Sequence, residues 1–451
     1  MRIDEISLRE VGPFDDARIE FPPGSDPTRA DVYLLTGPNG SGKSTVLYAL
    51  AGALTAGNAK SLSPDLGAAR MRTANSVYFV RAGEECLAAA WRVAANSERE
   101  KLDLGTSVAH AVLHGTTGFS YFATRPAREL NSYIASASDF ISFGPIGSEA
   151  KFAWAAFAYA GVRTVADVQV TNIEEPTDSP FAQSLSFLHT ANASRFAHWV
   201  ANQDFKRLKA KEAGRHDKAA ALRASISHVE RVVSEIIDAP FSFVTSYDDN
   251  NVRAKVGDRV IDLGLLPDGL KSIVSWVADL LMRLDRIPWV DDTPPQDRAF
   301  LLLLDEVDIH LHPAWQRKVL PIVQRLFPNA QIIASTHSPF VVASAVDARI
   351  ISLGLRNGVA TVDSNEPANA GASYSAILRS VFGIASEFDV DTEAQFQRFH
   401  ELKQRVIAGE ADARAALDLL IADLAGRSEE VREIIALEKR QLDRQLARKA
   451  A

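Results

Sequence analysis

Three short, largely apolar runs stand out along the chain, and each is followed directly by polar residues. The runs are DVYLL at 31–35, FLLLL at 300–304 and QIIAS at 331–335. Apolar residues in succession, without alternating polar positions, are typical of strands buried on both faces of a parallel sheet. Because ligands bind at the carboxyl ends of such strands, the polar residues after each run are candidate site residues.

The segment after the first run predicts a phosphate-binding loop. Residues 37–44 read GPNGSGKS, which fits G-x-x-x-x-G-K-[ST], and STVLYALAGAL then predicts a helix. Glycines let successive N–H groups point at the phosphates, and the positive end of the helix faces the anion. Lys43 would reach the β- and γ-phosphates of ATP, and the Ser44 hydroxyl would ligate Mg²⁺. The predicted ATP-binding residues of this loop are Gly37, Pro38, Asn39, Gly40, Ser41, Gly42, Lys43, Ser44 and Thr45.

The polar residues after the other two runs predict the rest of a hydrolytic site. Asp305 and Glu306 follow FLLLL, and His337 follows QIIAS. We expect Asp305 to hold Mg²⁺ through water, and Glu306 to be the general base or to orient the attacking water. An imidazole at 337 would contact the γ-phosphate and that water.

Composition sets limits on the class of protein. The chain has 451 residues, 47% hydrophobic and 24% charged, which predicts a soluble globular protein of two or three units. No apolar run approaches the ~18 residues that span a bilayer, so no membrane partner is expected. The charged N-terminus does not resemble a signal peptide, and the single Cys86 fits a cytoplasmic location. With a net charge of −8, contact with nucleic acid would need a local basic patch.

Taken together, GPNGSGKST, LLLLDEVDIHLHP and ASTHSP resemble a known family. They are similar to the ATP-binding-cassette type heads of the RecF and SMC group. The resemblance is closer to bacterial ATPases of the AAA-21 kind, which include ATPase subunits of anti-phage systems such as Septu and relatives of the OLD nucleases. It covers roughly 1–50 and 240–365. It implies an α/β P-loop NTPase, an ABC-ATPase-like head with mixed sheets.

The resemblance also implies a homodimer with two ATP molecules sandwiched between the heads. Each ATP would meet the phosphate loop of one subunit and a signature segment of the other, here residues 265–272, LLPDGLKS. Family members usually have serine where this chain has Pro267, which lacks both a hydroxyl and a backbone N–H. The N–H groups of Gly269 and Leu270, at a helix start capped by Asp268, could still bind phosphate; the alternative is a plain helix start. The implied ATP contacts are Asp268, Gly269, Leu270 and Lys271, with Asp308 lining the dimer seam.

The chain between these motifs predicts two insertions. Residues 55–180 contain short β-like runs, typical of an antiparallel sheet beside such heads. Apolar residues at 222, 226, 229, 233 and 236 then form one helical stripe, which predicts a short helical hairpin over 185–238. The basic residues of 206–218 are either a solvated helix face or a patch that contacts DNA phosphates. The predicted divisions are 1–184 and 239–365 for the ATPase head, 185–238 for the hairpin and 366–451 for a C-terminal helical segment.

The C-terminal segment and the remaining motif residues add less. Thr392-x-x-Gln395 predicts a capping box that opens a helix. Asp389-Val390-Asp391 matches the Asp-x-Asp of a TOPRIM nuclease by letter, but it precedes a helix instead of ending an apolar strand, so we expect no nuclease activity in this chain. His310 and His312 have no apparent third ligand and are expected to pack. No glutamine precedes Gln169, so the Mg²⁺-bridging glutamine of the family is unassigned.

The leading interpretation is a Mg²⁺-dependent ATPase that dimerises on ATP and switches a separate effector protein. Anti-phage defence with a nuclease partner is implied by the resemblance alone. One alternative is a RecF-like repair ATPase acting on duplex DNA, and another is the ATPase subunit of a transporter, against which the long insertion argues. A fourth is a nucleotide-gated scaffold that does not hydrolyse ATP. The sequence leaves assemblies larger than a dimer open.

Overall fold

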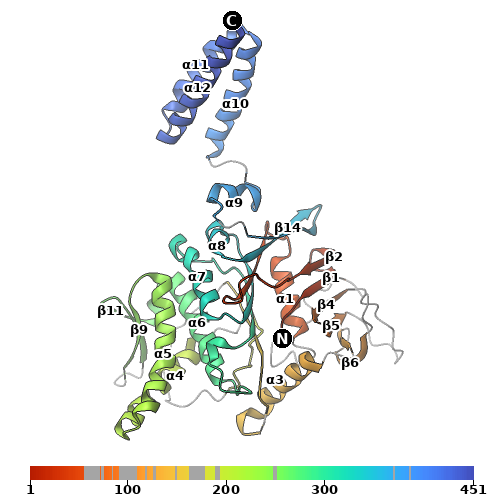
Figure 1. Ribbon diagram of the computed structural model, residues 1–451, viewed down its shortest axis with the longest axis vertical. Helices are drawn as coiled ribbons and strands as arrows, with labels where there is room; N and C mark the ends of the chain where they lie inside the picture. Colours follow the sequence, from red (N-terminus) through yellow and green to blue (C-terminus); the bar gives the residue numbers. More distant parts are fainter. Residues whose placement is uncertain are drawn as a thin grey trace. The chain divides into compact units, whose positions relative to one another are not determined.

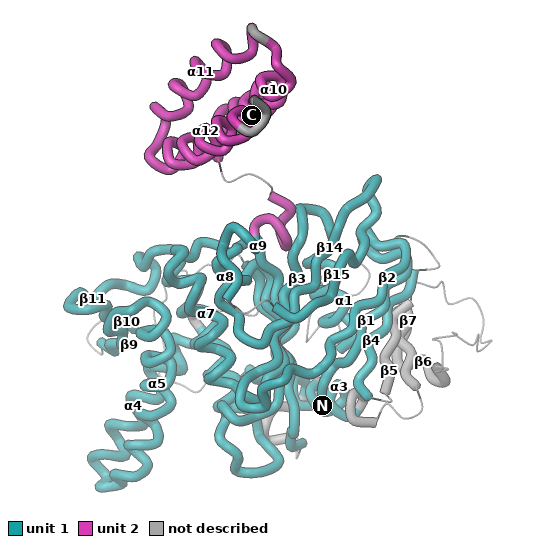
Figure 2. The backbone as a smooth tube through the Cα atoms, turned by 45° about the horizontal axis from the view of Figure 1, so that its top comes forward, with its two compact units in different colours: residues 1–377 teal, residues 378–451 magenta. Residues whose placement is uncertain are grey.

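The computed structural model forms two compact units, Met1–Ile377 and Leu378–Ala451 (Figures 1 and 2). The first contains all the described strands, and the second is helical. The structure describes residues 1–54, 72, 76–83, 85–90, 109–116, 119–124, 128–147, 150–161, 178–187, 193–246, 251–368, 371–384 and 388–450.

A six-stranded sheet forms the centre of the first unit. Its order is β15-β14-β3-β13-β12-β8; β14, β3, β13, β12 and β8 run parallel, and β15 is antiparallel to β14. The strands are β3 (Asp31–Thr36), β8 (Ala155–Tyr159), β12 (Phe300–Leu304), β13 (Ala330–Ser335), β14 (Ala348–Arg356) and β15 (Val359–Pro367). Every residue of β8, β12 and β13 is buried. The three predicted strands are therefore confirmed, and their carboxyl ends lie along one edge in the order β3, β13, β12.

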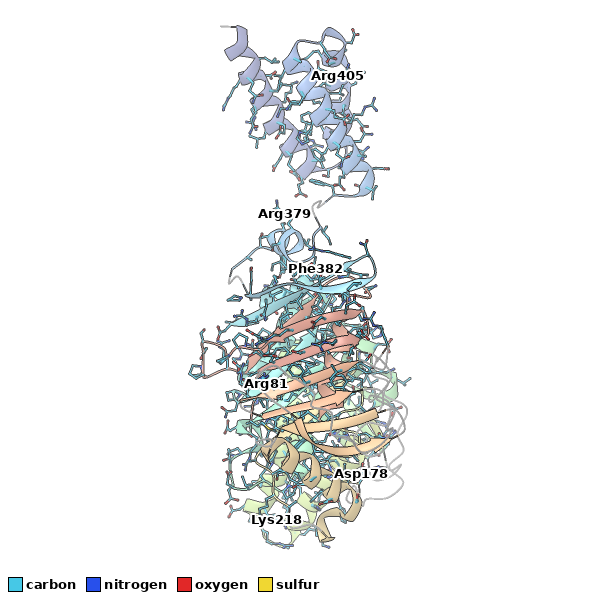
Figure 3. The ribbon with its side chains drawn as sticks, turned by 90° about the vertical axis from the view of Figure 1, so that its right-hand side faces the viewer. Arg81, Asp178, Lys218, Arg379, Phe382 and Arg405 are labelled. Carbon is cyan, nitrogen blue, oxygen red and sulfur yellow. The ribbon has the colours of Figure 1, made fainter. Side chains whose placement is uncertain are left out.

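A second sheet lies on one side of this core. It is antiparallel throughout, in the order β2-β1-β4-β5-β7-β6. The sequence predicted an antiparallel sheet from 55–180 only, and β1 and β2 extend it. Figure 3 shows its strands facing the viewer, with Arg81 labelled on β4. Helix α1 (Lys43–Ala53) contacts strands of both sheets and lies between them (Figure 1). The strands are β1 (Glu5–Val11), β2 (Phe14–Glu20), β4 (Val77–Ala82), β5 (Glu85–Ala90), β6 (Ala109–Thr116) and β7 (Phe119–Thr124). Helix α3 (Arg128–Gly147) follows them and was not predicted.

Helices cover the other side of the central sheet (Figure 1). Helix α6 (Asp268–Arg286) is buried over nearly its whole length and contacts α4 and α5. Helices α7 (Pro313–Leu326) and α8 (Pro339–Ser344) pack together. A small antiparallel sheet adjoins α5, with strands β9 (Phe241–Ser246), β10 (Asn251–Val256) and β11 (Arg259–Asp262). Short 3₁₀ turns occupy Leu263–Leu265 and Pro295–Asp297, and α9 is Tyr374–Ser380.

The predicted helical hairpin is confirmed as α4 (Ala193–Glu212) and α5 (His216–Ile237). The apolar stripe of α5 is buried at Ile226, Val229, Val233 and Ile236. Apolar side chains at these spacings share one face of a helix, and here that face packs against α4 and the neighbouring elements. Residues 188–192, at the predicted start of the insertion, lie outside the described part of the chain.

The second unit is a bundle of α10 (Val390–Ala408), α11 (Ala411–Ala425) and α12 (Glu429–Ala450). It has its own core, with Phe399 and Leu417 fully buried. The predicted capping box is wrong: α10 begins at Val390, and the Asp389 side chain accepts a hydrogen bond from the Thr392 N–H at 2.9 Å. Asp389 and Thr392 are both candidate N-cap residues, and the helix begins directly after Asp389. The predicted boundary between the ATPase head and the C-terminal segment, at 365/366, lies within β15. None of the described helices is long and apolar enough to cross a lipid bilayer.

Candidate functional site

The loop after β3 takes a shape that requires glycine. Gly37 and Gly42 have φ angles of +138° and +92°, where side chains are rarely accommodated. A Cβ at Gly37 would lie 2.1 Å from the Leu353 carbonyl oxygen, and one at Gly42 would lie 2.3 Å from the Phe14 ring. Pro38, Asn39 and Gly40 are exposed, whereas Ser41 is buried.

Lys43 is held inside this loop. Its Nζ donates hydrogen bonds to the carbonyl oxygens of Gly37 and Pro38, each at 2.9 Å. Burial lowers its pKa, and the negative charges of Asp305, Glu306 and Asp308 oppose that shift. A partly desolvated ammonium that is bound only to neutral backbone carbonyls gains strongly from an anion that replaces them.

The start of α1 adds backbone donors to the same loop. Gly42 occupies the N-cap position without a side-chain cap, and the first bond within the helix runs from the Val46 N–H to the Gly42 carbonyl at 3.0 Å. The N–H groups of Lys43 and Ser44 thus have no partner within the helix, which is the usual basis of anion binding at a helix N-terminus. The Thr45 side chain is buried against Gly12, so only its backbone could meet a phosphate.

Ser44 and Asp305 come together from distant parts of the sequence. The Ser44 hydroxyl donates to Oδ1 of Asp305 at 3.1 Å, and the Ser335 hydroxyl donates to the same oxygen at 2.5 Å. Hydroxyl and carboxylate oxygens are hard ligands, and Mg²⁺ is commonly bound by one or two such groups together with substrate phosphates. These residues therefore fit the predicted metal ion.

Glu306 lies in a strained turn directly after Asp305. Its φ is +48°, which is uncommon for a residue with a side chain. Its N–H donates to the Ser335 hydroxyl at 2.7 Å. Gly161, just beyond β8, makes room for it, since a Cβ there would lie 2.6 Å from the Glu306 Cβ and 2.8 Å from its Oε2. Backbone strain of this kind is often found at active sites.

His337 sits at the end of β13, beside the acids. Asp308 Oδ1 accepts hydrogen bonds from the Thr336 hydroxyl at 2.6 Å and from the His337 N–H at 3.3 Å. Burial and the Lys43 ammonium lower the pKa of His337, and Asp308, Glu306 and Asp305 oppose the shift. The lowered pKa favours the neutral imidazole at pH 7, which can donate or accept a hydrogen bond. Asp308, predicted at the dimer seam, also fixes this segment within its own subunit.

The signature segment differs in one respect from the prediction. Asp268 does not cap the helix: it is the first residue of α6, Pro267 occupies the N-cap position, and the carboxylate lies 3.6 Å from Lys271 Nζ. Without a side-chain cap, the N–H groups of Gly269 and Leu270 keep no partner in the helix. A Cβ at Gly269 would lie 2.5 Å from the His310 carbonyl oxygen, so the segment packs against the loop after β12.

The sequence does not single out every residue of this arrangement. Ser335 looks like part of a buried strand and nothing more, although it ends the strand between β3 and β12. Gly161 carries no signal, because the short run AAFAY is not distinctive enough to predict a strand of the central sheet. His312 caps α7 through its ring, which accepts from the Ala314 N–H at 3.3 Å. Gln169 lies outside the described residues.

Comparison with family models agrees with the resemblance seen in the motifs. The model described as "AAA domain, putative AbiEii toxin, Type IV TA system" matches residues 171–343. A second model, described as "AAA domain", matches residues 5–99. The resemblance to the AAA-21 kind of ATPase is thereby confirmed.

Similar proteins include "Retron Ec83 probable ATPase" of Escherichia coli, 30% identical over 34% of this chain and 29% of its own length. "Septu protein PtuA" of Bacillus thuringiensis is 31% identical over 30% of this chain and 38% of its own length. The chain thus spans well under half of the length of either relative. Among solved structures, an Smc head bound to the C-terminal winged-helix domain of ScpA is 16% identical, with a TM-score of 0.44 over 81% of this chain and 98% of that one.

Proposed function

We propose that this chain, which carries an AAA-type ATPase domain, is a Mg²⁺-dependent ATPase that dimerises on ATP and switches a separate effector protein. The observation that carries the proposal is the meeting of Ser44 with Asp305 at 3.1 Å, at the edge where β3, β13 and β12 end. Phosphate-loop donors, a candidate metal ligand and a candidate base thus share one site. Nucleotide binding alone would need only the first of these.

The residues divide the chemistry between them. The loop N–H groups and Lys43 bind the phosphates and stabilise the charge of the transition state. Glu306 orients a water for attack on the γ-phosphate and accepts its proton. The neutral His337 donates or accepts a hydrogen bond at that water. When bound at Ser44 and Asp305, Mg²⁺ would neutralise charge on the phosphate oxygens.

The switch proposal rests on the signature segment and the relatives. The N–H groups of Gly269 and Leu270, which have no partner within α6, are donors suited to a phosphate from a second copy of the chain. Relatives with the names "Septu protein PtuA" and "Retron Ec83 probable ATPase" support a role in anti-phage defence. The resemblance to Septu-type subunits is the reason to propose a nuclease as the separate effector.

Phosphate release by the wild type and by Glu306→Gln tests the hydrolysis. We expect release by the wild type, and its loss in Glu306→Gln with ATP binding retained, because the amide cannot accept the proton of water. Glu401→Gln, an exposed glutamate on α10, is the matched control. Release that persists in Glu306→Gln would contradict the assignment of the base. No release by the wild type would favour the nucleotide-gated scaffold.

Light scattering of Glu306→Gln tests the dimer. We expect a monomer that becomes a dimer only with ATP and Mg²⁺, since the nucleotide supplies much of the interface. A mass that does not respond to ATP would contradict a switch by association. The switch would then have to be a change within a permanent assembly.

The alternative of direct DNA binding is favoured by one observation. Lys209, Lys211, Arg215 and Lys218 are all exposed near the turn of the α4–α5 hairpin, where Figure 3 labels Lys218. In contrast, Arg207 is paired with Asp204 at 2.7 Å. Binding of duplex DNA that weakens steeply with salt and disappears when these four residues are neutralised would support this alternative.

A further inference from the structure

The side chain of Gln316, in the first turns of α7, joins two loops of the candidate site. Its Nε2 donates to the carbonyl oxygens of Asp308 at 3.1 Å and Leu311 at 2.9 Å. Its Oε1 accepts from the Ser338 hydroxyl at 2.6 Å. Both amide N–H groups and the amide oxygen are therefore used.

The two loops carry the residues proposed to act on water. The loop 305–312 follows β12 and bears Glu306, and the segment 336–338 follows β13 and bears His337. The first loop has two residues with side chains at positive φ, Glu306 at +48° and His310 at +61°. Such conformations cost of order 1–3 kcal/mol each and persist only where surrounding contacts enforce them. The Gln316 amide is such a contact, since it binds the backbone of this loop at two points.

We propose that Gln316 is a positioning residue that fixes the loop 305–312 against the segment 336–338 and so holds Glu306 and His337 in register for hydrolysis. The effect of Gln316 on catalysis rests on the proposed ATPase function. The fixing of the loop 305–312 against the segment 336–338 does not depend on that function. The signature segment depends on the same loop, because Gly269 packs against the His310 carbonyl. Gln316 thereby supports both the site of hydrolysis and the surface offered to a second copy.

The steady-state kinetics of Gln316→Glu and Gln316→Leu test this role. Glutamate keeps the size and still accepts from Ser338, but it cannot donate to the two carbonyls; leucine removes all three bonds. Neither change touches the phosphate loop, so we expect kcat to fall by about ten- to hundredfold in both, as for other residues that orient a ligand, with the KM for ATP little changed. Equal losses in kcat and ATP affinity, or wild-type kcat in Gln316→Glu, would overturn the proposal.

The same helix provides a matched control. Gln324 is a buried glutamine that, like the half-buried Gln316, donates to two backbone carbonyls, those of Ala30 at 3.3 Å and Val346 at 2.8 Å, away from both loops. Gln324→Leu should lower the melting temperature without lowering kcat. If it lowers kcat as much as Gln316→Leu, the effect on turnover is general destabilisation and the proposal is wrong.

Amide hydrogen exchange of the full chain without ATP tests the fixing independently of turnover. We expect Gln316→Leu and Gln316→Glu to increase exchange at 306–311 and at 337–338 together, and Gln324→Leu to leave both unchanged. Unchanged exchange in both Gln316 variants would overturn the proposal. If the wild type hydrolyses no ATP but the exchange increases as expected, the fixing stands and the proposed ATPase function fails.

Discussion

The hydroxyl of Ser335 lies 2.5 Å from Oδ1 of Asp305 and donates a hydrogen bond to it. The same hydroxyl accepts the N–H of Glu306 at 2.7 Å. Because Ser335 ends β13, which lies between β3 and β12, one side chain holds both acids at the edge facing the phosphate loop. The hydrogen bond from Ser335 thus holds the Asp305 carboxylate where the Ser44 hydroxyl also reaches it.

Ser335→Ala should therefore weaken the use of Mg²⁺. The change removes a donor from Asp305 and leaves the Glu306 N–H without its acceptor. We expect the Mg²⁺ concentration for half-maximal phosphate release to rise by about ten- to hundredfold, as for other partners of a metal ligand. Ser344→Ala in α8, whose hydroxyl binds the Val341 carbonyl, should leave it unchanged. A wild-type Mg²⁺ dependence in Ser335→Ala would mean that this bond does not orient Asp305.

The centre of the fold could be predicted because its signals are local. Strands β3, β12 and β13 are continuous apolar runs, and each is followed at once by chemically distinctive residues. A strand in the middle of a parallel sheet needs apolar residues on both faces, and the polar residues that follow these three runs distinguish them from other short apolar segments. The site residues after these strands followed from the phosphate-loop motif and from the edge that the three strands share.

The other features of the fold and the site could not be predicted, because they depend on contacts between residues far apart in the sequence or on one of two local patterns that fit equally well. Gly161 matters only because Glu306 lies against it, and neither sequence neighbourhood shows this. Thr392 matches a capping box, yet it lies three residues after Asp389, which caps the helix instead. Gln316 resembles any polar residue on a helix until its three partners are seen.

The pH dependence of hydrolysis should reflect His337. Burial and Lys43 lower its pKa below the ordinary value of about 6.5, so the imidazole stays largely neutral as the pH falls to 6.5. Protonation at a lower pH would add a positive charge near Lys43, and kcat should fall only in that lower pH range. In His337→Gln, kcat should be reduced and this decline absent, whereas His216→Gln, an exposed residue, should keep the wild-type profile. The same decline in His337→Gln would assign it to another group.

Pro267→Ser should strengthen the ATP-dependent dimer. Proline at the N-cap offers no hydroxyl, whereas serine would place one beside the N–H groups of Gly269 and Leu270, where it would donate to the same phosphate. Loss of the proline rigidity should lower the free energy of unfolding by only about 0.4–1 kcal/mol. In the Glu306→Gln background, less ATP should be needed for half-maximal dimer by light scattering.

Pro294→Ser is the control for that change, because Pro294 is an exposed N-cap proline of a 3₁₀ turn outside the signature segment. It should leave the ATP requirement unaltered. An identical ATP requirement in Pro267→Ser would show that the hydroxyl of the usual serine plays no part across this interface.

The buried ion pair of α6 should be essential for stability. Asp279 Oδ2 accepts from Arg283 Nε at 2.6 Å, and both side chains are almost fully buried. Burial acts to lower the pKa of Arg283, but the charge and hydrogen bond of Asp279, together with the charges of Tyr159 and Asp178, outweigh burial and the pKa is raised. Asp279→Asn would leave a buried guanidinium without its counter-charge, and the free energy of unfolding should fall by about 3–5 kcal/mol.

Urea denaturation measures this difference. Asp268→Asn removes an exposed carboxylate that lies 3.6 Å from the half-buried Lys271 on the same helix, and it should cost less than about 1 kcal/mol. Comparable losses of unfolding free energy in the two variants would mean that burial does not determine how much the Asp279–Arg283 pair contributes to stability.

Gly161→Ala should slow hydrolysis while sparing ATP binding. The added Cβ would lie 2.6 Å from the Glu306 Cβ, and since the Glu306 backbone is held by Ser335, the carboxylate must move. A displacement of the order of 1 Å at a catalytic group can cost about a hundredfold in rate, so kcat should fall by about that factor, measured by phosphate release. ATP affinity, measured by calorimetry, should be unchanged because the phosphate loop is untouched. Gly426→Ala, at a helix end in the C-terminal unit with its nearest neighbour at 3.3 Å, should leave both quantities as in the wild type. A Gly161→Ala protein with wild-type kcat would place Glu306 outside the catalytic step.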